Sequence, residues 1–121
     1  MQSGRKLEPH QIKTVLQSIL RGVSHLSANR IIHRDLKPEN IMFRQEGSSE
    51  VALCDFGLAT YADEGKYLFV RCGTPGFVAP EIINIKDMST KSQPISDVFS
   101  VGVILHYLLL GYSVFEGKKY N

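Results

Sequence analysis

The chain has 121 residues, of which 43% are hydrophobic and 21% are charged, and its formal net charge is +2. This length fits one small domain with a hydrophobic core, and the composition excludes a disordered chain. The weak net charge is not that of a nucleic-acid-binding surface, so we expect no nucleic-acid partner. We expect no membrane partner either, because the longest apolar run, residues 98–110, is interrupted by polar residues and is too short to span a bilayer.

Two cysteines, Cys54 and Cys72, lie far apart in the sequence and show no Cys-x-x-Cys spacing. The N-terminus has no basic region followed by an apolar one, so the sequence shows no secretory signal. We therefore interpret both cysteines as reduced thiols in a cytoplasmic protein. A disulfide between them is the alternative.

Residues 1–8 are polar, contain Gly4 and are predicted to be a frayed leader. From Pro9 onward the apolar residues recur with a helical period and form one wide stripe: Ile12, Val15, Leu16, Ile19, Leu20, Val23 and Leu26. Pro9 fits the first turn of a helix, where its missing N–H has no partner to lose. We expect the helix to end near residues 28–29, since Asn29 tolerates a left-handed C-terminal conformation.

The next stretch, residues 33–40, reads His-Arg-Asp-Leu-Lys-Pro-Glu-Asn and lies between the apolar runs 31–32 and 41–43. These runs could pair as strands and hold the polar stretch as a loop with buried ends. Asp35 is a carboxylate able to accept a proton, Lys37 can neutralise charge on a transferred group, and Asn40 offers an oxygen suited to Mg²⁺. The alternative is a solvated charged turn around Pro38.

After this loop, a turn signal at residues 47–49 separates the run 41–43 from a returning strand at 51–54. Such a hairpin places Asp55 close to Asn40, and two oxygen ligands from separate loops suit the Mg²⁺ ion of a bound nucleotide. Residues 58–71 have no clear period and are predicted to form a mobile surface loop.

In the C-terminal third, residues 82–92 are predicted to hold a short helix and a polar turn. A strongly apolar helix follows over about residues 97–110, capped by Ser96-Asp97 and ended by Gly111. We expect this helix to be buried.

Three motifs in this order resemble eukaryotic-type protein kinases. Residues 33–40 match the catalytic loop His-Arg-Asp-Leu-x-x-x-Asn, Asp55-Phe56-Gly57 matches the metal-binding signature, and Ala79-Pro80-Glu81 matches the end of the activation segment. Lys-Pro-Glu in the loop is similar to the serine/threonine branch, and residues 76–78 lean toward the calmodulin-dependent kinase group.

The resemblance implies a mainly α fold with a small β-hairpin: a partial kinase C-terminal lobe over residues 9–121, with the N-terminal lobe absent. It also implies an activation segment over residues 55–81 and a central helix at about 97–110.

The resemblance further implies ATP and Mg²⁺ as cofactors and a protein serine or threonine as acceptor. Asp35 would be the catalytic base, Lys37 would steady the γ-phosphate, and Asn40 and Asp55 would hold Mg²⁺. Met42 would form the floor of the adenine site. Glu39, grouped with the nucleotide-facing residues, also resembles the acidic residue that meets a basic residue upstream of the target serine.

Other matched residues would have positioning roles. His33 and Phe56, the latter followed by Gly57, would stack in an apolar column anchored by Asp97. Asp97 would reach the backbone of residues 33–34; a plain helix cap is the alternative. Thr74 would hydrogen-bond near Asp35 and Lys37, and Glu81 would pair with an arginine that has no counterpart here.

Two departures from the family pattern concern activity and regulation. The sequence has no Gly-x-Gly-x-x-Gly loop and no strand lysine of the Val-Ala-Ile-Lys type, so we expect weak or no activity alone and a partner that supplies the missing lobe or regulates it. Val70 stands where an activating phosphoacceptor often lies, four residues before Thr74, so any anionic partner of Arg34 must come from elsewhere. Other candidate modification sites are Thr60, Tyr61 and Tyr67.

The main hypothesis is therefore a partial protein serine/threonine kinase that transfers the γ-phosphate of ATP. The alternatives are a noncatalytic kinase-like binding module that keeps the substrate-facing loops, or a truncated relic without a stable fold.

Overall fold

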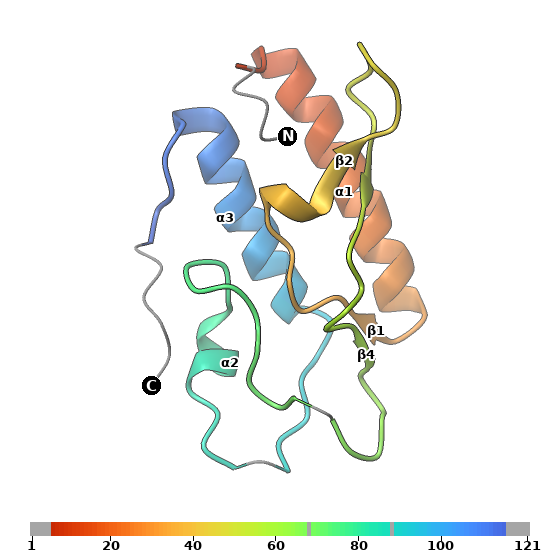
Figure 1. Cartoon of the computed structure of the whole chain (residues 1–121), viewed down its shortest axis with the longest axis vertical. Coiled ribbons are helices and arrows are strands. Elements are labelled where there is room, and N and C mark those ends of the chain that lie inside the picture. The colour runs from red at the N-terminus through yellow and green to blue at the C-terminus, as the bar shows by residue number, and fades with distance from the viewer. Residues whose placement is uncertain (1–5, 68, 88, 116–121) are drawn as a thin grey trace.

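The computed structural model describes residues 6–67, 69–87 and 89–115. The elements in chain order are α1 (Pro9–Ala28), β1 (Ile31–Ile32), a 3₁₀ turn (Pro38–Asn40), β2 (Ile41–Phe43), β3 (Val51–Leu53), β4 (Thr60–Tyr61), α2 (Pro80–Ile83) and α3 (Ser96–Leu110). Helices α1 and α3 pack side by side, and the β2–β3 hairpin lies against α1 (Figure 1). Three helices and a small hairpin agree with the predicted mainly α fold, whereas the lobe assignment stays a prediction.

Helix α1 has the predicted bounds because its apolar stripe faces the core. Its buried residues are Ile12, Val15, Ile19, Val23 and Leu26. The last two residues of the predicted leader are part of the packed structure. Leu7 is buried, and the Glu8 N–H donates to Gln11 Oε1 at 2.8 Å. Residues 1–5 of that leader lie outside the described residues. At the other end the left-handed residue is Arg30, with φ 57°, and not Asn29.

The strands pair differently from the expectation that residues 31–32 and 41–43 could pair. Strands β2 and β3 form the predicted antiparallel hairpin, with Ile41 opposite Leu53. Strand β1 instead pairs with β4, with Ile32 opposite Thr60. The residues between β1 and β2 are therefore a loop joining two sheets, not the turn of a hairpin. Two-residue strands are too short to show an alternating pattern, which explains why β4 was not predicted.

Two hydrophobic clusters hold these elements together. The first joins α1, the hairpin and α3 and contains Leu36 from the polar loop, which is 1% exposed. The second is formed by Tyr67, Val70, Val78, Ala79, Ile82 and Ile85, with Phe99 packed against it. The prediction of a mobile surface loop over residues 58–71 is thus wrong in part, because irregular backbone there still buries apolar side chains at uneven spacing. The short helix predicted within 82–92 begins earlier, at Pro80.

Helix α3 begins at Ser96 and ends at Leu110, and the next residue, Gly111, has a φ of 80° and is the predicted left-handed stop. No side chain caps its N-terminus. The Asp97 carboxylate instead accepts hydrogen bonds from the backbone N–H groups of His33, at 2.8 Å, and Arg34, at 3.1 Å. The plain-cap alternative for Asp97 is therefore wrong, and the contact implied by the family resemblance is present.

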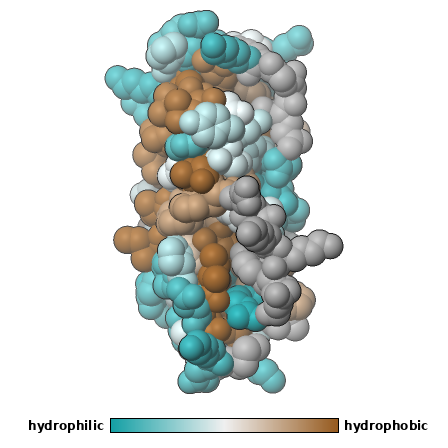
Figure 2. Space-filling model, turned by 90° about the vertical axis from the view of Figure 1, so that its left-hand side faces the viewer, coloured by the Kyte–Doolittle hydropathy of each residue, from teal (hydrophilic) through white to brown (hydrophobic). Residues whose placement is uncertain are grey.

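The expectation that α3 is a buried helix holds for one face only. Val98, Leu109 and Leu110 are each about half exposed, and Figure 2 shows apolar side chains on the side of the molecule where α3 lies. The reason is that α3 is apolar nearly all round, while within the described residues its neighbours cover a single face. Among those residues, no helix is both long and apolar enough to cross a membrane.

We predict that Asp97→Ala lowers the free energy of unfolding by about 1–3 kcal/mol, because the N–H groups of His33 and Arg34 lose their acceptor. Urea denaturation followed by circular dichroism measures this change. Asp63→Ala is the matched control, since Asp63 is an exposed carboxylate that forms a surface ion pair with Arg30. A transition midpoint for Asp97→Ala equal to that of the control would contradict a supporting role for Asp97.

Candidate active site

Helix α3 fixes the polar loop that follows β1. Arg34 has φ 74°, in the left-handed region that side chains other than glycine seldom adopt. The two hydrogen bonds that the Asp97 carboxylate accepts hold this backbone in place. Burial raises the pKa of Asp97, while the hydrogen bonds from His33 and Arg34 act in the opposite direction. This largely desolvated carboxylate thus satisfies one buried and one partly buried N–H donor.

His33 connects the loop to the segment after β3. Its side chain is fully buried, its Nδ1 accepts the Asp35 N–H at 3.1 Å, and its Nε2 lies 2.7 Å from the carbonyl oxygen of Cys54. This pattern requires the proton on Nε2, which donates to Cys54. The ring also lies 4.9 Å from that of Phe56, so the predicted contact between these two residues is present.

Asp35, Lys37 and Thr74 form one hydrogen-bonded group. The Thr74 hydroxyl donates to Asp35 Oδ1 at 2.6 Å and accepts a bond from Lys37 Nζ at 2.9 Å. Lys37 Nζ lies 3.9 Å from Asp35 Oδ2 and 4.0 Å from Glu39 Oε2. The structure therefore brings together the two predicted catalytic residues and the threonine that follows Gly73, 39 positions along the chain from Asp35.

Gly73 is required at this junction. Its φ is 121°, and a Cβ atom there would lie 2.7 Å from Val78 Cγ2 and 3.0 Å from the carbonyl oxygen of Arg34. Glycine alone permits this backbone conformation together with such a close approach to the loop. Gly73 thus lets Thr74 reach Asp35.

Asn40 and Asp55 lie at the same end of the hairpin. The Cys54 N–H donates to the Asn40 carbonyl at 2.8 Å, which places residue 55 just beyond that bond. The Asn40 side-chain nitrogen donates to the Asp35 carbonyl at 2.8 Å, leaving its oxygen as the group for a cation. Asp55 is exposed, has φ 56°, and accepts the Gly57 N–H at 3.1 Å.

This donor set fits Mg²⁺ bound to a nucleotide, because that ion takes one or two carboxylates and completes its shell with phosphates and water. Within the described residues, no group of three or more His, Cys, Asp or Glu side chains could hold a metal ion by itself. Asn40 and Asp55 as metal ligands remain a prediction.

The remaining predicted residues have different surroundings. Met42, the proposed adenine floor, is 56% exposed on β2. Glu39 is exposed. Glu81 accepts a bond from the Ser96 hydroxyl at 3.0 Å, which joins the end of the activation segment to α3. The catalytic and binding roles of these side chains stay predictions.

Two features were missed by the sequence reasoning. Arg34 has backbone partners in place of the sought anion: its Nε donates to the Leu58 carbonyl at 2.7 Å and its Nη1 donates to the Phe69 carbonyl. Tyr67, predicted as a candidate modification site, is 4% exposed, and its hydroxyl donates to the Ala62 carbonyl. Only the spacing of apolar residues at 62, 67 and 70 hinted at this burial.

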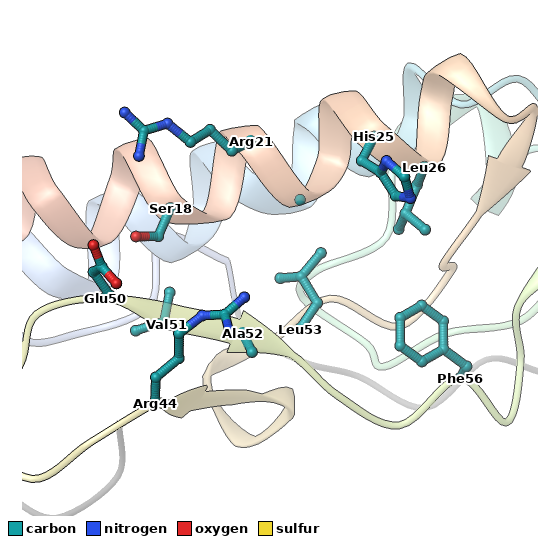
Figure 3. A pocket seen from close by; sticks show the side chains of 11 residues that line it. Ser18, Arg21, His25, Leu26, Arg44, Glu50, Val51, Ala52, Leu53 and Phe56 are labelled. Carbon is teal, nitrogen blue, oxygen red and sulfur yellow. The ribbon is translucent and has the colours of Figure 1, made fainter.

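A pocket of about 480 Å³ lies between α1 and the β2–β3 hairpin. Figure 3 shows Arg21 and His25 on α1 and Arg44 on the hairpin around it, with Phe56 at one end. Of the predicted site residues, Phe56 alone lines this pocket. It is therefore separate from the group around Asp35.

The two cysteines are free thiols, as predicted. Burial raises the pKa of Cys72, while the charge of Arg34 acts against this rise. The structure thus gives no support to the disulfide alternative.

The Thr74–Asp35 hydrogen bond joins the loop that resembles a kinase catalytic loop to the segment that resembles a kinase activation segment. The sequence profile of the protein kinase domain family matches residues 1–121. The chain belongs to this family.

Relatives include the probable serine/threonine-protein kinase fhkC of Dictyostelium discoideum, which is 39% identical to the chain over 113 residues. The chain is 40% identical over 113 residues to a titin homolog of Caenorhabditis elegans and 39% identical over 113 residues to the death-associated protein kinase dapk-1 of the same species. It is 40% identical over 105 residues to the calcium/calmodulin-dependent protein kinase cmkB of Emericella nidulans. The last three of these matches cover 93%, 93% and 84% of this chain but 1%, 8% and 25% of the relatives' lengths.

We predict that Gly73→Ala lowers the free energy of unfolding by about 1–3 kcal/mol, because the new methyl group meets Val78 and the Arg34 carbonyl in a strained conformation. Gly65→Ala is the matched control, since nothing lies within 4 Å of a Cβ at that position. Denaturant unfolding of both variants checks this expectation. Equal stability of the two variants would refute the need for glycine at residue 73.

Proposed function

We propose that the chain forms part of a protein serine/threonine kinase that transfers the γ-phosphoryl group of ATP to a serine or threonine hydroxyl of a protein. The observation that carries this proposal is the contact of Thr74 with both Asp35 and Lys37. This contact joins the activation segment to the catalytic loop. A site that positions an acceptor hydroxyl requires such a fixed arrangement.

In this proposal Asp35 orients the acceptor hydroxyl and takes its proton as the oxygen attacks the γ-phosphorus. The Thr74 hydroxyl donates to Oδ1 of Asp35 at 2.6 Å, which fixes the rotation of the carboxylate. Oδ2 accepts the Asn40 amide at 3.4 Å and keeps a second lone pair for the acceptor. Lys37 stabilises negative charge on the transferred group. Its ammonium is already held by the Thr74 hydroxyl, so it needs little reorganisation.

Asn40 and Asp55 would hold Mg²⁺, which when bound neutralises charge on the ATP phosphates. Asn40 is suited to this task because its amide nitrogen is fixed by the Asp35 carbonyl. The same bond couples the proposed metal ligand to the proposed base. Met42, exposed on β2, would contact the adenine.

Further parts of the proposal concern partners and location. The glycine-rich loop and strand lysine that position ATP in kinases do not occur in the sequence, so we propose that they are supplied by another part of the polypeptide or by another chain. Glu39 would favour substrates with a basic residue upstream of the target hydroxyl, since it presents an exposed carboxylate near Lys37. We propose a cytoplasmic location, where ATP is present and thiols stay reduced.

We predict that Mg·ATP binding to the 121-residue chain depends on Asp55. The variant Asp55→Asn removes the charge of this ligand but keeps its shape. Isothermal titration calorimetry should show Mg·ATP binding weakened at least about tenfold, because a charged oxygen ligand binds more strongly than a neutral one. Asp63→Asn is the matched control, since Asp63 is exposed and paired with Arg30.

Asp35→Asn separates binding from chemistry in the same experiment. It should leave Mg·ATP binding close to that of the parent and lower phosphotransfer by about 10²- to 10⁴-fold wherever transfer to a protein substrate is measurable, because a general base is lost. Equal Mg·ATP affinity of the parent and Asp55→Asn would refute the metal-binding role. Phosphotransfer unchanged by Asp35→Asn would refute the kinase mechanism.

A further inference from the structure

The activation segment docks on Arg34 of the catalytic loop through backbone carbonyl groups. Residue 70, where an activating phosphate would be sought, is a valine that is 6% exposed and belongs to the second hydrophobic cluster. A phosphate cannot be added at this position, and an apolar side chain in a packed cluster gains stability from being buried there.

Arg34 supplies the polar half of this docking. Its guanidinium donates to the carbonyl oxygens of Leu58 and Phe69, which lie on either side of the segment's middle. Two carbonyl groups of the segment thus accept two of the five N–H donors of this guanidinium. The same guanidinium lies 5.4 Å from the centre of the Tyr67 ring, within the range of a cation–π interaction.

A second cation, Lys91, makes contacts of the same kinds with the segment. Lys91 Nζ donates to the carbonyl oxygens of Glu64 and Gly65 and lies 4.5 Å from the centre of the Tyr67 ring. Tyr67 therefore has two cations at its ring, and each of these cations also binds two carbonyl groups of the segment.

The Tyr67 hydroxyl completes the attachment. It donates to the Ala62 carbonyl at 2.7 Å and accepts the Ser92 N–H at 3.2 Å. These bonds tie the segment both to itself and to the stretch that precedes α3. A buried tyrosine whose hydroxyl and ring are both partnered has one position available to it.

We infer that Tyr67, together with Arg34 and Lys91, docks the activation segment in the place of a phosphate, so that docking needs no phosphorylation. Tyr67 is thus a positioning residue: it acts on the site through Arg34, which Asp35 follows directly in the chain. The inference rests on the proposed function for its meaning, but its test uses neither ATP nor substrate.

The experiment is limited proteolysis of the 121-residue chain, phosphatase-treated and shown by mass spectrometry to carry no phosphate. Trypsin cleavage after Lys66 and Arg71 reports opening of the segment, because cleavage of folded protein follows the population of the open form. In the parent both sites should resist trypsin relative to the urea-unfolded chain. Arg34→Met and Tyr67→Leu should each speed cleavage about 5- to 30-fold.

Further variants make the result specific. Combining Arg34→Met with Tyr67→Leu should speed cleavage less than the product of the two single effects, because the two side chains contact each other. Tyr67→Phe keeps the ring, loses both hydroxyl bonds and should have an intermediate effect. Tyr61→Phe and Arg44→Met alter exposed residues of the same types and should leave cleavage unchanged.

Two results would overturn the inference. One is an unphosphorylated parent whose segment is cut as fast as the unfolded chain and is protected only after phosphorylation. The other is an unchanged cleavage rate in Arg34→Met, which would show that Arg34 does not hold the unphosphorylated segment. Neither result bears on Mg·ATP binding, so failure of this inference and failure of the proposed function are distinguishable.

Discussion

The buried carboxylate of Asp97 is the constraint on which the site depends. It is 3% exposed, and its two oxygens accept the N–H groups of His33 and Arg34. Burying a charge is costly, and the raised pKa of Asp97 reflects that cost. The two hydrogen bonds offset this cost, and they also hold Arg34 in a left-handed conformation that its side chain disfavours. The loop's shape is thus set by α3, 63 residues further along the chain.

From this fixed turn, contacts spread to each part of the site. His33 reaches the Cys54 carbonyl just before Asp55, Asp35 reaches Thr74, and the Asp35 carbonyl holds Asn40. Two segments distant in sequence, and the end of the loop itself, therefore take their positions from this turn. Since each link is a hydrogen bond between partly or fully buried groups, loosening the turn should disturb all of them together.

The sequence predicted what local patterns and motifs encode. Helix α1 follows from its apolar period, the hairpin from its turn signal, and the contacts of Asp97 and Thr74 from the family resemblance. The pairing of β1 with β4 and the burial of Tyr67 could not be predicted, because two-residue strands have no period and irregular segments are packed by tertiary contacts alone. The pocket beside α1 was missed for the same reason, since it exists only between elements.

Helix α3 connects the two hydrophobic clusters. Its first turns contribute Phe99 to the cluster of the activation segment, while Val101 and Ile104 belong to the cluster of α1 and the hairpin. Asp97 lies at the same end of the helix as Phe99 and binds the loop between these clusters. A displacement of the activation segment would therefore also disturb α3, the helix that anchors the loop of Asp35. This shared support explains how side chains as distant as Tyr67 and Asp35 can depend on one another without touching.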